Sequence, residues 1–137
     1  MIDIALAIAK KAHAGQVDKA GIDYIQHPLY VASQVKTEQE KAVALLHDVI
    51  EDSDVTADDL LASGLSNEVV TAVQILTKKK GQSYQEYLEK VKSNNLARIV
   101  KLADLKHNSD LSRLKSVTNT DYERVKKYKN AIHYLST

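Results

Sequence analysis

The run Leu45-Leu46-His47-Asp48-Val49-Ile50-Glu51-Asp52 sets four polar side chains among aliphatic residues. Its apolar positions, together with Ala42 before it, have helical spacing and predict a buried helix face. Burying an unpaired charge costs free energy, so polar groups beside such a face need a shared partner that neutralises them. A divalent metal ion is one such partner, because the neutral imidazole of His47 and the carboxylate of Asp48 are both good ligands for a transition ion.

Consecutive helical residues point about 100° apart, so His47 and Asp48 can share one ion only where other parts of the chain supply further ligands. Two positions offer such ligands. His27 precedes Pro28, and proline is tolerated best at the first position of a helix, so we expect His27 at a helix entrance, rigid and partly exposed. Asp104 is flanked by apolar residues that predict a buried helix, and a buried carboxylate needs a partner. From this stretch alone that partner is either a metal ion or, equally well, Lys101 or His107 in a surface pair.

The composition is that of a single domain, which we place at residues 1–137. Hydrophobic residues make up 44% and charged residues 27% of the chain, both ordinary values for a soluble protein. The net charge of +1 gives no reason to expect binding to a nucleic-acid polymer or an anionic membrane. Because the chain has seven Tyr but no Phe or Trp, the core must be aliphatic, with tyrosine hydroxyls near its edge. The lack of cysteine excludes disulfides and thiolate metal sites.

Helical periodicity predicts an all-α bundle of about seven to eight helices. The expected helices span residues 2–14, 28–35, 38–50, 56–61, 67–78, 84–92, 94–108 and 121–135, with N-caps at Thr56, Ser66 and Ser83. The residues between Gly15 and His27 form a loop, with a short extended piece at Tyr24–Ile25. Lys78–Lys80 either complete the C-terminus of a helix or steer an anionic substrate. With no basic N-terminal region and no long apolar run, we expect a cytoplasmic protein.

The chain also carries several separated motifs in a definite order. They are Ala12-His13-Ala14-Gly15-Gln16 followed by Lys19, Tyr24-Ile25-Gln26-His27-Pro28, the run from Leu45 to Ser53, Leu76-Thr77-Lys78, and Lys101-Leu102-Ala103-Asp104 followed by His107-Asn108. Together they resemble the hydrolase domain of RelA/SpoT stringent-response proteins, within the HD phosphohydrolase superfamily. The resemblance covers roughly residues 5 to 115, and the combination of motifs makes it specific.

The resemblance implies an all-α HD domain that binds manganese, or another divalent transition ion, and removes the 3′-diphosphate of (p)ppGpp. The positions that match the metal ligands of this family are His27, His47, Asp48 and Asp104. It also implies that Glu51 and Asp52 activate or orient the attacking water and that Asn108 holds the nucleotide. The chemistry of the residues agrees, since two imidazoles and two carboxylates leave coordination positions open. Glu51, one turn after His47, can serve as general base.

Other polar residues near the expected site are candidates for supporting roles. Lys19 and Lys101 are cations for the charge of a phosphate group. His107 is expected either beside the metal ligands or in contact with the substrate. His13 is expected beside the site or as a core histidine, and His133 is expected to be structural.

The chain departs from the family pattern where guanine and phosphate contacts are expected. Asp18 stands where a basic residue is usual, Leu105 replaces the Arg of Asp-Arg-Leu-His-Asn, and Ser109–Leu111 replace a Met-Arg-Thr type of sequence. We therefore expect intact metal chemistry on a small nucleotide, with (p)ppGpp as the leading substrate, and hydrolysis alone, since no synthetase domain follows. The alternatives are a phosphatase for another nucleotide or phosphorylated metabolite, and a non-catalytic nucleotide sensor. The acids Glu51 and Asp52 argue against a sensor, because a protein that only binds a nucleotide gains nothing from a base that activates water.

Overall fold

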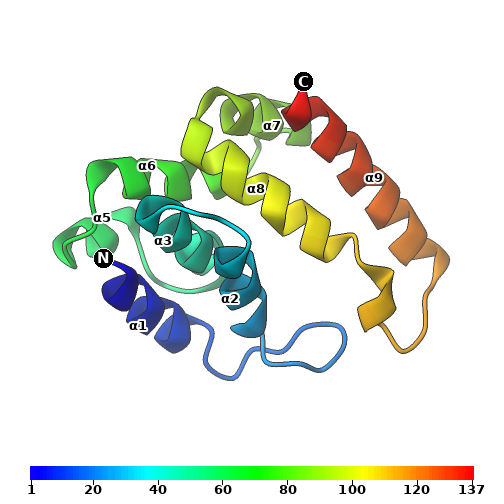
Figure 1. The fold of residues 1–137 in the computed structure, drawn as a ribbon, viewed down its shortest axis with the longest axis horizontal. Helices are drawn as coiled ribbons and strands as arrows, with labels where there is room; N and C mark the ends of the chain where they lie inside the picture. Colours follow the sequence, from blue (N-terminus) through cyan, green and yellow to red (C-terminus); the bar gives the residue numbers. More distant parts are fainter.

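The computed structural model describes the backbone of residues 1–137 and every side chain except that of Arg113. The elements are α1 (Ile2–Ala12), α2 (Gln26–Ser33), α3 (Glu38–Leu46), α4 (Val49–Asp52), α5 (Ala57–Ala62), α6 (Asn67–Leu76), α7 (Tyr84–Ser93), α8 (Asn95–Asn108), the 3₁₀ turn η1 (Leu111–Arg113) and α9 (Asn119–Ser136). The all-α prediction is confirmed (Figure 1). Across the described backbone the only β pairing is an isolated bridge between Val17 and Asp23, so the extended piece expected at Tyr24–Ile25 was misplaced.

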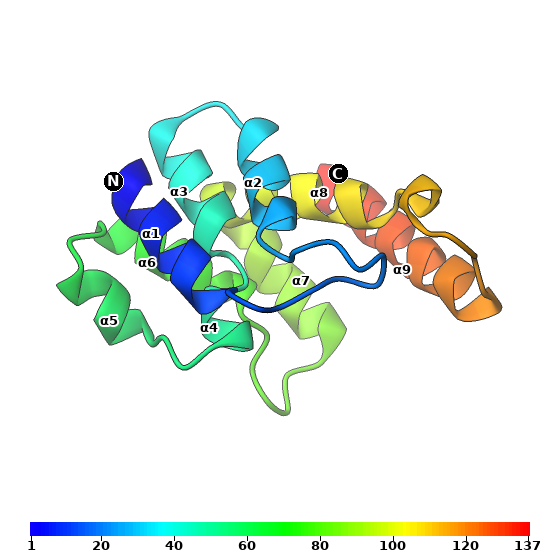
Figure 2. The same cartoon turned by 90° about the horizontal axis from the view of Figure 1, so that it is seen from below.

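Helix α3 forms the centre of the molecule. It packs against α1, α2, α6 and α8, and α9 lies along α8 (Figures 1 and 2). Its residues 42–46 are at most 3% exposed. Within the described residues the buried hydrophobic cluster is aliphatic apart from Tyr87, as the composition predicted. Burying each Val or Leu side chain stabilises the fold by about 1.5–3 kcal/mol, so this helix anchors the predicted ligands His47 and Asp48 at its C-terminal end.

The helix starts follow the capping residues of the sequence. Thr56, Ser66 and Ser83 each accept a hydrogen bond from the backbone amide three residues on, as predicted. Thr118 forms a cap of the same kind, so α9 begins two residues earlier than expected. Helix α6 ends at Leu76, and Lys78–Lys80 therefore lie beyond it. None of the helices in the described part of the chain is both long and apolar enough to cross a membrane.

The single helix expected over residues 38–50 is divided at His47 and Asp48 into α3 and α4. Asp48 has φ −108° and ψ 0°, which is turn rather than helix geometry. The Nδ1 atom of His47 lies 2.5 Å from the carbonyl oxygen of Ala44, which holds the imidazole against the last turn of α3. Because of this break, the side chains of His47 and Asp48 reach one point instead of diverging around a helix axis.

The entrance of α2 also differs from the expectation. The helix begins at Gln26, so Pro28 is its third residue, where the missing N–H costs nothing because first-turn amides have no intrahelical acceptor. The backbone amide of His27 donates to the carbonyl of Tyr24 over 3.0 Å, and this turn extends the helix backwards. His27 is consequently 5% exposed rather than partly exposed.

Candidate active site

Three segments bring four predicted ligands to one place. His27 comes from α2, His47 and Asp48 from the turn between α3 and α4, and Asp104 from α8. The Nε2 atom of His27 lies 2.7 Å from Oδ1 of Asp104, and Nε2 of His47 lies 3.4 Å from the same oxygen. Asp48 Oδ2 is 3.1 Å from Nε2 of His47. One ligand atom each from His27, His47 and Asp104 lie within 4.8 Å of one another, and all three residues are buried.

The hydrogen bonds of His47 show that this cluster suits a cation. Its Nδ1 donates to the Ala44 carbonyl, so in the neutral ring Nε2 carries a lone pair. That lone pair faces oxygens of Asp48 and Asp104, yet Nε2 has no hydrogen bond of acceptable geometry with any described group. Burial disfavours the charged ring, but the two carboxylates still raise the pKa of His47 well above its ordinary value. The two carboxylates therefore favour a positive charge within the cluster. Two imidazoles with two carboxylates fit a divalent transition ion.

Neighbouring side chains orient two of the predicted ligands, His27 and Asp48. The Nδ1 atoms of His27 and His107 lie 2.6 Å apart, and the His107 ring also stacks on Tyr30 with centroids 4.2 Å apart. Tyr24 donates a hydrogen bond from its hydroxyl to Asp48. Such contacts fix the tautomer and the orientation of metal ligands. His107 therefore lies beside the ligands, which is one of its two predicted positions.

Asp104 is held in its charged form by its surroundings. Burial opposes ionisation, but Lys101, His27 and His47 together keep the pKa of the Asp104 carboxyl well below its usual range. Nζ of Lys101 lies 3.0 Å from Oδ2, and Nδ2 of Asn108 donates to Oδ1 over 3.0 Å. The carboxylate is thus ready to bind a cation without first losing a proton.

The two acids of α4 lie at the edge of the cluster. Glu51 and Asp52 are exposed to solvent. Burial of part of the carboxyl and the charges of Asp48 and Asp52 raise the pKa of Glu51, while Lys101 and His47 lower it to a smaller extent. Burial and Asp48 likewise raise the pKa of Asp52. A raised pKa makes each carboxylate a better proton acceptor.

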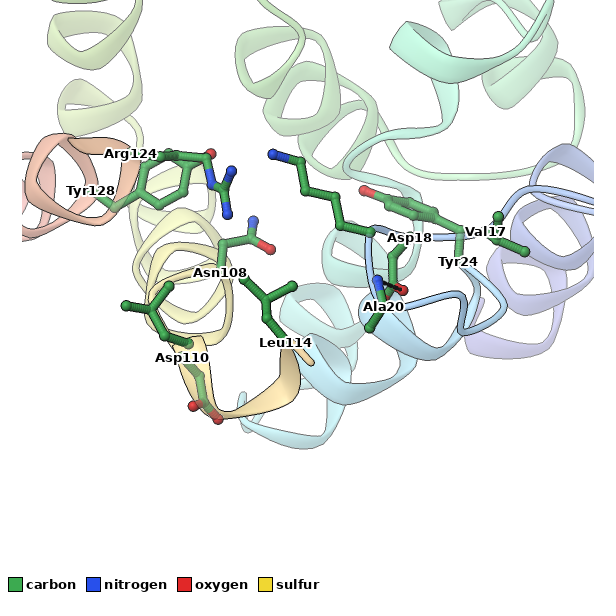
Figure 3. A pocket seen from close by; sticks show the side chains of 11 residues that line it. Val17, Asp18, Ala20, Tyr24, Asn108, Asp110, Leu114, Arg124 and Tyr128 are labelled. Atoms are coloured by element: carbon green, nitrogen blue, oxygen red, sulfur yellow. Dashed lines mark hydrogen bonds between the residues drawn. The ribbon is translucent and has the colours of Figure 1, made fainter. Parts of the chain in front are cut away.

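A cavity of about 300 Å³ lies between the loop after α1 and helix α9. In Figure 3, Arg124, Tyr128 and Asn108 lie along one side of it, and Asp18, Ala20 and Tyr24 along the other. The remaining lining residues are Val17, Lys19, Asp110, Leu111 and Leu114. Because Asn108 bonds Asp104 and Tyr24 bonds Asp48, the cavity adjoins the ligand cluster.

The comparisons with known proteins agree with this geometry. The model of the HD domain family matches residues 5–130. The chain belongs to the HD domain family. Its curated relatives include the guanosine-3′,5′-bis(diphosphate) 3′-pyrophosphohydrolase of Haemophilus influenzae, 40% identical over 115 residues, and the bifunctional (p)ppGpp synthase/hydrolase SpoT of Escherichia coli, 33% identical over 118 residues. These alignments cover 74% and 76% of this HD domain but 17% of each relative. The predicted resemblance to RelA/SpoT-type proteins is confirmed.

A solved structure has the same fold as this HD domain. It is a metazoan ortholog of SpoT, described as hydrolysing ppGpp and playing a role in starvation responses. The superposition has a TM-score of 0.79 and covers 98% of this chain and 84% of the other, at 23% sequence identity. The predicted HD-domain bundle is confirmed as the fold.

The residues that depart from the family pattern lie in different parts of this HD domain. Asp18 lines the cavity, and its Oδ1 accepts hydrogen bonds from the amides of Ala20 and Ile22, which build the loop. Leu105 is fully buried in the core. Ser109 donates its hydroxyl proton to the carbonyl of Leu105. Asp18 and Asp110 both line the cavity, so two of the departures add a carboxylate to its wall.

Sequence reasoning missed Arg124 and Tyr128, two polar residues that line the cavity. Arg124 and Tyr128 are four residues apart on α9 and so share one face. Tyr128 lies within the helix predicted over residues 121–135, and Arg124 has no motif around it. Nη2 of Arg124 bonds Oδ1 of Asp121 at 2.9 Å, while Nη1 is buried and has no hydrogen-bond partner among the described groups. His133, predicted to be structural, is exposed on the same helix.

Proposed function

We propose that this HD domain is a metal-dependent phosphohydrolase of a phosphorylated nucleotide, with (p)ppGpp as the leading substrate and removal of the 3′-diphosphate as the reaction. The observation that carries the proposal is the convergence of His27, His47 and Asp104 within 4.8 Å, with Asp48 beside them. The H. influenzae and E. coli relatives, a 3′-pyrophosphohydrolase and the synthase/hydrolase SpoT, support this substrate.

Manganese is the proposed metal, with another divalent transition ion as the alternative. It would be held by His27, His47, Asp48 and Asp104. When bound, it supplies a Lewis acid and lowers the pKa of a bound water. The donor set supports this, because imidazole nitrogens and carboxylate oxygens suit such ions and the sequence contains no thiolate.

Glu51 is the proposed general base, and Asp52 orients the water. The Glu51 carboxylate accepts a proton from the water that attacks the phosphorus next to the 3′ oxygen. The bond between that phosphorus and the 3′ oxygen breaks, and the oxygen takes up a proton and leaves as a hydroxyl. The raised pKa of Glu51 suits this role, because it increases the affinity of the carboxylate for the proton.

The cavity of Figure 3 is the proposed nucleotide site. Lys19 and Arg124 bring positive charge to it, and Asn108 and Tyr128 bring hydrogen-bonding groups. Lys101 lies on the metal side, where its ammonium bonds Asp104, and supports phosphate charge there. His107 is proposed to orient His27 rather than to bind the substrate, because its ring stacks between His27 and Tyr30.

Asp18 favours a second candidate, a phosphatase for another nucleotide or phosphorylated metabolite. A carboxylate in the cavity adds negative charge where a ligand with several phosphates gains most from cations. A nucleotide sensor is a weaker candidate, because it gains nothing from Glu51. We further propose that residues 1–137 form one domain, and the cytoplasmic location stays a prediction.

A panel of nucleotides, assayed with Mn²⁺ for released phosphate and pyrophosphate, tests the proposal. Pyrophosphate released from (p)ppGpp alone is the expected result. Turnover of other nucleotides without (p)ppGpp would establish the second candidate. Tight binding without any product would leave the sensor and overturn the hydrolase.

A further inference from the structure

His13 is a buried histidine outside the ligand cluster. It is the C-cap residue of α1 and is 2% exposed. Its Nδ1 lies 2.9 Å from Oε1 of Gln16. The Nε2 amide group of Gln16 donates to the carbonyl of Ala12 over 3.2 Å and to the carbonyl of Asp52 over 3.0 Å. Since both carbonyls require a donor, the amide orientation is determined, and Oε1 must accept from His13.

The two side chains thus form a continuous hydrogen-bonded link, the His13–Gln16 clasp, from the end of α1 to the last residue of α4. The two helices lie next to each other in the fold (Figure 2). The clasp spans 36 positions of sequence between Gln16 and Asp52. It therefore restrains tertiary structure rather than a local turn.

Helix α4 needs such a restraint. It has four residues, a single turn, and one turn of helix is not stable by itself. Its terminal carbonyls have no intrahelical N–H donor and must find donors elsewhere. Ser53 donates its hydroxyl proton to the Val49 carbonyl over 2.6 Å, and Gln16 donates to the Asp52 carbonyl. On the inner side, Val49 is fully buried.

The backbone turn at Gly15 allows the clasp to form. It has φ +82°, in the left-handed region that favours glycine. The chain turns back there, so that the amide of Gln16 donates to the His13 carbonyl over 3.0 Å. The turn directs the Gln16 side chain towards α4. The run Ala12-His13-Ala14-Gly15-Gln16, which the proposed reaction does not otherwise use, is explained by this link.

The same imidazole also contacts the support of a metal ligand. The ring of His13 lies 4.9 Å from that of Tyr24, whose hydroxyl donates to Asp48. One buried side chain therefore touches both the group that holds Asp48 and the link that holds Asp52.

We infer that His13 and Gln16 are positioning residues for the acids of α4: by holding the Asp52 carbonyl, they fix Glu51 and Asp52 relative to the metal ligands. The role of those acids rests on the proposed function, whereas the restraint on α4 does not. Neither residue touches the reacting atoms. The clasp acts through the placement of the proposed base and its neighbour.

Hydrogen exchange of the metal-free protein tests the restraint. In Gln16→Ala, we expect the Asp52 amide, which bonds the Asp48 carbonyl over 2.9 Å, to exchange about fivefold faster, while α3 amides keep their rates. The matched control is Gln74→Ala, at an exposed position of α6. Unchanged exchange at Asp52 in Gln16→Ala would overturn the inference, because the carbonyl would then be held by other groups.

Kinetics of the Mn²⁺-loaded protein test the positioning. In Gln16→Ala, kcat is expected to fall about tenfold or more with KM and bound metal unchanged. His13→Asn keeps a donor near the Nδ1 position and should retain most of the activity, whereas His13→Leu should behave like Gln16→Ala. If the two residues had only a structural role, metal content and thermal stability would fall in step with kcat. Equal rates for His13→Asn and His13→Leu would contradict the clasp. If the wild-type protein turns over no nucleotide, the hydrolase proposal fails, and hydrogen exchange still decides the restraint on α4.

Discussion

Nζ of Lys101 lies 3.0 Å from Oδ2 of Asp104, one turn away on α8, and both side chains are largely buried. The ammonium is one of the charges that lower the pKa of Asp104. This pair keeps one oxygen of the carboxylate occupied, while Oδ1 faces His27 and His47. The lysine predicted as a phosphate contact therefore also fixes a proposed metal ligand.

Replacing Lys101 by Met is expected to weaken metal binding by about tenfold or more, because Asp104 loses both orientation and a charge that favours its ionised form. The onset of metal binding should also shift to higher pH, since Asp104 then releases its proton less readily. Isothermal titration with Mn²⁺ across pH measures both effects. Lys106→Met, at an exposed position of the same helix, is the control and should bind as the wild type does.

Glu51→Gln is expected to retain the metal and slow turnover by on the order of 100-fold, the usual scale for loss of a general base. The wild-type rate should fall as pH decreases through the raised pKa of Glu51, because the protonated carboxyl no longer accepts a proton. This acidic limb should disappear in the variant. A pH–rate profile of both proteins with metal analysis makes the test. An unchanged rate would remove Glu51 from the mechanism.

Metal and proton should compete for His47. The pKa of this residue is raised in the folded protein, so its contribution to stability is complete below about pH 6.5 and is lost as pH rises through the folded pKa. A bound metal ion would replace that proton, and Mn²⁺ should therefore raise Tm more at about pH 8.5 than at about pH 6, by roughly 4 °C.

Thermal melts with and without Mn²⁺ at both pH values test this competition. Asp104→Ala is the control, since removing that carboxylate should abolish bound metal, the metal-induced shift and activity together. An equal shift at both pH values in the wild type would place the ion away from His47.

Arg124→Ala is expected to raise KM by about tenfold or more while kcat changes little, since the guanidinium lines the cavity and has a buried, unpaired Nη1. Steady-state kinetics with the nucleotide selected by the panel make this measurement. Lys126→Ala, at an exposed position on the same helix, removes equal charge and should leave KM unchanged. Equal effects of the two variants would indicate long-range electrostatics instead of contact.

Sequence patterns predicted the helical class because caps and apolar periodicity are local signals, whereas the convergence of the ligands was predicted from metal chemistry and from the resemblance to the HD superfamily. Thr56, Ser66 and Ser83 carry their own capping information, and each opens a helix in the structure. The break at His47 and Asp48 was missed, because apolar periodicity continues through it and nothing in the neighbouring residues marks a turn.

The cavity wall on α9 was missed for a different reason. Arg124 reaches the site through the packing of α9 on α8, a contact between distant segments that no local pattern encodes. The same applies to Gln16, whose partner Asp52 lies far along the chain. His27 was placed correctly beside Asp104, but its burial depends on the turn before α2.

The interruption between α3 and α4 separates two tasks that an unbroken helix would have coupled. Residues before the turn are anchored in the hydrophobic interior, whereas Glu51 and Asp52 lie on a short solvent-facing segment. If the proposed function holds, substitutions of these two acids would alter the hydrolytic step without disturbing cation loading. Catalytic efficiency and metal occupancy would then be independently adjustable properties during evolution.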